Sequence, residues 1–124
     1  MSGDKRLGWW ITENVYRHHV RVFASKDRKK AGQFFRQGFP AEPDPGLNVG
    51  GRTVMGTDVY IWISDKSSLP TLAHECFHAV SFIMDRVGQP LDAHHDEAYA
   101  YLFEYLFRAS LQVLGHRKLS HVSK

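Results

Sequence analysis

The chain has 124 residues, of which 43% are hydrophobic and 13% are aromatic, so it can bury one substantial core but is too short for two. Its formal net charge of +3 is too small by itself to indicate a nucleic-acid-binding protein. We expect no secretory signal in the opening residues, which lack an apolar stretch, and no membrane span, because charged residues interrupt the longest apolar segments.

The first part of the chain predicts a strand, a short helix and a long loop. His19–Ser25 is rich in β-branched residues and alternates, which is typical of a strand. A short helix should follow, with Ser25 or Asp27 as its N-cap and Gly38 at its end. Residues 39–51 contain three of the five prolines and three glycines, so they must form a loop.

The middle of the chain predicts two strands within residues 52–64, joined around Gly56–Asp58. The second strand covers Val59–Ser64, where aliphatic residues alternate with Tyr60 and Trp62. One face of this strand can therefore pack on helices, while the two aromatic side chains point the other way. An exposed edge strand and an ordinary core strand would show this same pattern.

Two long helices are predicted to complete the domain. The first has Ser67 or Ser68 as its N-cap and runs to about Val87, where a glycine and a proline stop it. The second can begin at Asp92 and end near Leu114, before another glycine. The order of strand, helix, strands, helix and helix predicts an α+β domain.

The first of these helices contains two histidines in an HExxH pattern. His74 and His78 are four residues apart and project about 40° from each other, which suits two imidazoles that bind one metal ion. Apolar residues, Cys76 and Phe77 among them, fill the opposite arc of the helix and should face the core. The two histidines must therefore point to solvent or into a cleft.

Glu75 lies at the edge of the polar side of this helix, beside the expected metal position. A carboxylate that does not bind the metal can accept a proton there from a metal-activated water. A pair of surface histidines without any metal would give the same pattern. The interpretation as a metal site therefore depends on a third ligand.

The second long helix offers Glu97 as that third ligand, since a catalytic zinc usually has three protein ligands and one open position. The turn between the helices is short, which favours an antiparallel pair and would bring Glu97 close to the histidines. His94 and His95 are alternative ligands at or before the start of the helix. Asp96 could orient a ligand histidine. Alternatively, the helix dipole simply favours an acidic residue in the first turn.

The HECFH motif of residues 74–78, followed by 18 residues and then Glu97, which Asp96 precedes, resembles the gluzincin group of zinc metallopeptidases. The resemblance covers residues 53–105 and is closest to the minimal, single-domain members of that group. It implies a small zincin-like domain, in which a short mixed sheet packs on the HExxH helix and on a second long helix.

The resemblance also implies a set of roles. His74, His78 and Glu97 would hold one Zn²⁺ ion per chain, and Glu75 would be the general base that aids attack of water on a peptide bond. An edge strand of the sheet, for which Val59–Ser64 is the candidate, would pair with the extended substrate. Tyr101 is the first candidate for the residue that stabilises the oxyanion, and the others are Tyr99, Tyr105, His94 and His95.

We expect one domain over residues 1–124, with an amino-terminal part at 1–52, a metal-site core at 53–115 and a basic tail at 116–124. The leading hypothesis is a zinc-dependent peptidase with a peptide or protein substrate and no nucleic-acid or membrane partner. The alternative is a non-catalytic zinc-binding module for protein interaction. The short chain favours it, because a second lobe that would help to hold a substrate has no room.

Several other residues have simpler interpretations. Cys76 is the only cysteine, so an internal disulfide is excluded and a cytoplasmic protein is expected. Glu104 and Arg108 are four apart and predict a surface ion pair. The basic cluster at Lys26–Lys30 predicts a solvated helix face.

Overall fold

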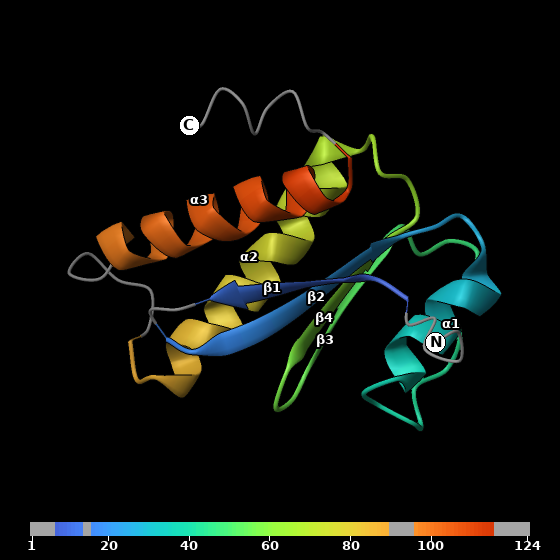
Figure 1. The fold of residues 1–124 in the computed structure, drawn as a ribbon, viewed down its shortest axis with the longest axis horizontal. Coiled ribbons are helices and arrows are strands. Elements are labelled where there is room, and N and C mark those ends of the chain that lie inside the picture. Colours follow the sequence, from blue (N-terminus) through green and yellow to red (C-terminus); the bar gives the residue numbers. More distant parts are fainter. Residues whose placement is uncertain (1–6, 14–15, 90–95, 116–124) are drawn as a thin grey trace, which may run out of the picture.

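The computed structural model describes residues 7–13, 16–89 and 96–115. Within these residues the chain forms strands and helices in the order β1 (Trp9–Glu13), β2 (His18–Ala24), α1 (Arg28–Arg36), β3 (Gly51–Met55), β4 (Val59–Ile63), α2 (Leu69–Arg86) and α3 (Asp96–Val113). Figure 1 shows α2 and α3 crossing one side of the sheet, with α1 on the other side. The α+β class expected from the sequence is confirmed.

The four strands form one mixed sheet in the order β1-β2-β4-β3. β2 and β4 are parallel, whereas β1 pairs with β2 and β3 pairs with β4 in antiparallel fashion. β4 is therefore a central strand with neighbours on both sides, and β3 is an edge. The suggestion that residues 59–64 form an exposed edge is wrong, because every residue of β4 is buried.

The alternation in β4 divides the molecule into two cores. Val59, Ile61 and Ile63 pack with α2 and α3 in the larger core, while Tyr60 and Trp62 pack with α1 in the smaller one. The sheet is consequently covered on both faces. The chain has three layers, with α2 and α3 on one side and α1 on the other.

The helix ends agree with the predicted caps where the structure describes them. The Asp27 carboxylate accepts hydrogen bonds from the first turn of α1, so Asp27 rather than Ser25 is its N-cap. Ser68 is the N-cap of α2, and Gly88 ends it with a φ of +77°, a conformation that favours glycine. The predicted start of the last helix at Asp92 lies outside the described residues.

β1 is a strand that the sequence did not predict, and it forms the second edge of the sheet. Its sequence, WWITE, contains residues that favour strands, but the three apolar residues are consecutive and do not alternate with polar ones. Pairing with β2 along its whole length fixes its extended conformation. In the part of the chain that the structure describes, no helix combines the length and hydropathy needed to cross a membrane.

Candidate metal centre

His74 and His78 lie on the exposed side of α2, as the helical spacing predicts. Their Nε2 atoms are 3.1 Å apart, and the two rings are nearly perpendicular, at 84°. Two nitrogens that bind one tetrahedral zinc at about 2.0–2.1 Å would lie about 3.3 Å from each other. The pair therefore fits a zinc ion, although a hydrogen bond between two neutral imidazoles also accounts for the contact.

Glu75 is buried, with 5% of its surface exposed, and it faces β3 rather than the solvent beside the histidines. The Thr53 hydroxyl donates a hydrogen bond to its Oε1 at 2.7 Å. A Cβ added to Gly51 would lie 3.0 Å from Glu75 Oε2, so a larger residue at this position of the strand would press on the carboxylate. The edge strand thus positions the carboxylate one residue away from His74.

The backbone of β3 beside Glu75 has an open hydrogen-bonding edge. Gly50 and Gly56 are bonded to the strand on the other side of the hairpin, through Ser64 N to Gly50 O at 2.8 Å and Gly56 N to Asp58 O at 3.0 Å. In an antiparallel ladder every second residue is bonded to the partner, so Gly51, Thr53 and Met55 direct their N–H and C=O groups away from β4. This edge can accept another extended strand.

Glu97 is exposed in the first turn of α3, and the structure does not bring it to the histidines. The two helices contact each other where Cys76 Sγ lies 3.9 Å from Ser110 Oγ, and Ser110 is 13 residues beyond Glu97. At 1.5 Å per residue, this contact is about 20 Å along α3 from Glu97. Among residues 7–13, 16–89 and 96–115, no group of three or more metal-binding side chains is present.

The alternative ligands His94 and His95 lie outside the described residues. The tyrosines proposed for the oxyanion occupy three different environments along α3. Tyr101 is 65% exposed, Tyr99 is buried, and the Tyr105 hydroxyl donates a hydrogen bond to the Thr12 carbonyl at 2.7 Å. The hydrogen bond of Tyr105 therefore connects α3 to β1. Tyr101 lies four residues, or about one helical turn, after Glu97.

Phe77 departs from the expectation that it faces the core, because 45% of its surface is exposed. It lies at the border of the apolar arc of α2, about 60° from His74 around the helix axis. Met55, at the end of β3, is also exposed. Phe77 therefore adds an exposed aromatic side chain beside the histidine pair, a feature that a helical wheel without tertiary neighbours cannot show.

Cys76 faces the core, as expected, and burial raises the pKa of its thiol to about 12. The thiol consequently stays protonated at neutral pH and is a poor metal ligand. Arg108 and Glu104 form the predicted ion pair. Lys29 and Lys30 are exposed as expected, but Arg28 of the same basic cluster donates hydrogen bonds to the carbonyls of Gly46, Leu47 and Val49, so it fixes the long loop.

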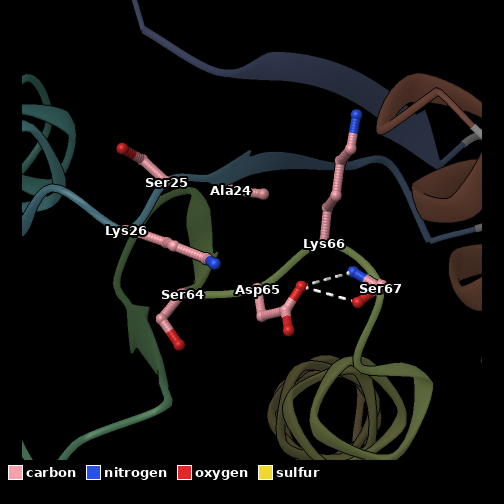
Figure 2. A pocket seen from close by; sticks show the side chains of 7 residues that line it. All are labelled: Ala24, Ser25, Lys26, Ser64, Asp65, Lys66 and Ser67. Atoms are coloured by element: carbon pink, nitrogen blue, oxygen red, sulfur yellow. Dashed lines mark hydrogen bonds between the residues drawn. The ribbon is translucent and has the colours of Figure 1, made fainter.

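A concave region of about 380 Å³ lies at the carboxyl ends of the parallel strands β2 and β4. Figure 2 shows its polar lining, in which the backbone N–H and the hydroxyl of Ser67 bond to Asp65 Oδ1 at 2.9 and 2.7 Å. The Ser67 hydroxyl and backbone N–H hold the pKa of Asp65 below its ordinary value. This carboxylate organises the turn before α2 and is not part of the histidine site.

These observations define a site from the outer face of α2 and the open edge of β3. The sequence identified its two histidines and its glutamate, but Thr53 and Gly51 were missed, because their roles depend on pairing across the fold. The chain matches no protein-family model, no curated protein and no solved structure, so the arrangement of its own residues has to carry the assignment of function.

Proposed function

We propose that this chain is a zinc-dependent peptidase of the minimal zincin-like type. The observation that carries the proposal is the convergence of His74 Nε2 and His78 Nε2, 3.1 Å apart on an exposed helix face, beside a buried carboxylate at an open strand edge. A protein that only bound zinc would need neither a general base such as Glu75 nor an open strand edge for a substrate.

The roles follow from the positions of the side chains. Zinc, when bound by His74 and His78, supplies an activated water and polarises the carbonyl of the scissile bond. Glu75 takes a proton from the attacking water at Oε2 and later delivers it to the leaving amine. The Thr53 hydroxyl donates a hydrogen bond to Oε1 of Glu75, so Oε2 is the oxygen proposed for proton transfer.

The open edge of β3 supports a peptide or protein as the substrate. An extended chain can add to Gly51, Thr53 and Met55 as a further antiparallel or parallel strand, and main-chain hydrogen bonds would then hold it next to Glu75. The proposed setting is the cytoplasm, in keeping with a single buried cysteine.

Glu97 is the proposed third zinc donor, by resemblance to gluzincins. The distance along α3 means that Glu97 can serve only if the first turn of this helix lies closer to α2 in the metal-bound chain. His94 and His95 are the alternative donors. A comparison of variants at these three positions, described below, decides between them.

The second candidate function is a non-catalytic zinc-binding module that contacts another protein. It is favoured by the convergence of only two metal-binding side chains in the described residues, and by the exposed Phe77 beside them. The conversion of Glu75 to glutamine separates the two functions, because a binding module does not need a general base.

The test is cleavage of a diverse peptide library by the wild type and by Glu75→Gln, each with its zinc content measured. We expect about one zinc per chain in both proteins and a loss of cleavage of roughly 10²–10⁴-fold in the variant. Zinc-loaded wild type that cleaves no peptide, while it still binds a protein partner equally well as Glu75→Gln, would identify the binding module instead.

A further inference from the structure

The sheet face that packs against α1 contains a buried arginine that the proposed peptidase chemistry does not use. Arg21 lies in the middle of β2, and only 1% of its surface is exposed. In the strand ladder it is paired with Trp10 of β1 and with Tyr60 of β4. Directly paired residues point to the same face of a sheet, so these three side chains form one row on the face opposite α2 and α3.

The indole of Trp10 covers the guanidinium group of Arg21, and we call this indole the roof of the site. Arg21 Cζ is 4.8 Å from the centre of the indole, and the indole is 6.0 Å from the ring of Tyr60. Since β1 and β4 are separated by β2, Trp10 must lean across Arg21 to reach Tyr60. The outer side of this roof is in solvent, because 43% of Trp10 is exposed, and His19 borders it with its ring 6.0 Å away.

Two nitrogens of the enclosed guanidinium lack hydrogen-bond acceptors in the described residues. Arg21 Nε and Nη1 are both buried, and neither has a partner in the part of the chain that is described. Stacking on an indole stabilises the positive charge but gives the N–H groups nothing to bond to. A buried charge is usually both paired and hydrogen-bonded, because its desolvation is costly otherwise.

Two acidic residues that the structure describes on this side of the sheet, Glu42 and Asp44, already form ion pairs with other arginines. Glu42 lies 3.4 Å from Arg52, whose guanidinium is stacked over Phe35 on the same face of the sheet. Asp44 lies 2.8 Å from Arg36 of α1. Neither of these two carboxylates is a partner of Arg21, whose Nε and Nη1 bond to no group in the described residues.

We propose that Arg21 is the floor of a carboxylate-binding site that opens when the indole of Trp10 moves off the guanidinium. A single negative charge matches the single positive charge, whereas a phosphate dianion would leave excess charge among aromatic rings. A planar carboxylate also matches the planar fork of arginine donors. The carboxylate belongs either to a small free acid or to an acidic side chain of a partner protein.

The test follows the Nε–H signal of Arg21 by NMR in the full chain during addition of sodium acetate, with sodium chloride at equal ionic strength as the reference. Acetate should shift this signal and raise the unfolding temperature, and chloride should do neither. Arg21→Met keeps the apolar bulk of the side chain without its charge, so the acetate-dependent rise in unfolding temperature should be lost. Arg52→Met is the matched control, because it removes a stacked arginine that already has a carboxylate, and it should keep the acetate response.

A pair of short peptides that differ only in one glutamate or glutamine, and that carry no other charged group, distinguishes the two sources. A response to acetate without one to the glutamate peptide identifies a small free acid, and a response to both shows that the site also accepts an acidic side chain of a partner protein. The absence of any response in the wild type, or a response that survives in Arg21→Met, overturns the proposal. So does a shift of the Arg21 signal on Asp4→Asn or Asp92→Asn without added acetate, because the chain would then supply its own carboxylate.

A further variant keeps the proposal testable if Arg21→Met does not fold. Trp10→Ala removes the roof, so acetate no longer has to displace it and should bind more tightly than to the wild type. Unchanged or weaker acetate binding in Trp10→Ala would contradict the proposed opening.

Discussion

At the scale of single residues, Glu75 connects the histidine pair to the sheet. Its carboxylate accepts a hydrogen bond from Thr53 and lies against the backbone of Gly51, while its neighbour His74 points to solvent. A side chain at Gly51 would make a tight contact with this carboxylate. The position of the proposed general base therefore depends on a glycine in another element.

Gly51→Ala should move this carboxylate and lower peptidase activity while zinc remains bound. The new Cβ would lie 3.0 Å from both Glu75 Oε2 and Thr71 Cγ2, so one of these groups must shift. Overpacking of this kind costs about 1–3 kcal/mol of the free energy of unfolding, and a catalytic group displaced by about 1 Å can cost about 10²-fold in activity. The measurements are kcat/KM on a cleaved peptide, zinc content and thermal unfolding.

Gly50→Ala is the matched control for Gly51→Ala, because a Cβ at Gly50 would meet no atom within 4 Å. It should keep both the activity and the stability of the wild type. Equal activity in the two variants would show that the contact between Gly51 and Glu75 is not important for catalysis.

Glu97→Ala, His94→Ala and His95→Ala should differ in their affinity for zinc. If Glu97 is the third donor, Glu97→Ala should weaken zinc binding much more than the two histidine variants, since a carboxylate oxygen is lost from the coordination sphere. Titration of each metal-free protein with zinc measures the affinity. Loss of zinc in His94→Ala or His95→Ala, with retention in Glu97→Ala, would replace the gluzincin ligand set by three histidines.

At the scale of elements, α2 and β3 together make the site, and neither would suffice alone. α2 supplies the metal-binding pair, and β3 supplies both the support for Glu75 and an edge whose N–H and C=O groups at alternate residues are directed outward. The edge location of β3 follows from the strand order, which places the more apolar β4 inside the sheet.

Met55→Pro tests the edge as a substrate-binding strand. The N–H of Met55 is directed away from β4, so proline removes a donor to the substrate without breaking the ladder. One lost hydrogen bond of about 1 kcal/mol should lower kcat/KM about fivefold. Val54→Pro should instead remove a ladder hydrogen bond and lower the free energy of unfolding by about 1–3 kcal/mol. Unchanged kcat/KM in a folded Met55→Pro protein would exclude this role.

At the scale of the whole molecule, zinc should stabilise the folded chain, because the histidine pair is assembled by α2 and is absent from the unfolded state. A ligand at 100 times its Kd adds about 2.7 kcal/mol, which for a domain of this size raises the unfolding temperature by roughly 10 °C. Thermal unfolding with zinc and with a chelator measures the difference. His74→Ala should unfold at the same temperature in both conditions, and a similar zinc effect in that variant would place the bound metal elsewhere.

The sequence by itself determined the helices, three of the four strands and the HExxH residues. These features depend on local patterns, namely helical spacing, alternation and capping residues, and such patterns act over a few neighbouring positions. Asp27, Ser68 and Gly88 are examples, because each ends or begins a helix through its own backbone or side chain.

Only the tertiary structure decided which residues meet. The apolar alternation of β4 is the same for an edge and a central strand, so its place in the sheet depends on the pairing with β2 and β3. β1 was missed because its five residues show no alternation of apolar and polar side chains, and its place in the sheet is set by pairing with β2. Glu75 became buried, and Arg21 became enclosed below Trp10, since burial is set by neighbours that are distant in the sequence. Glu97 was expected beside the histidines from the short turn alone, but its distance from them is set by where α2 and α3 cross, at Cys76 and Ser110.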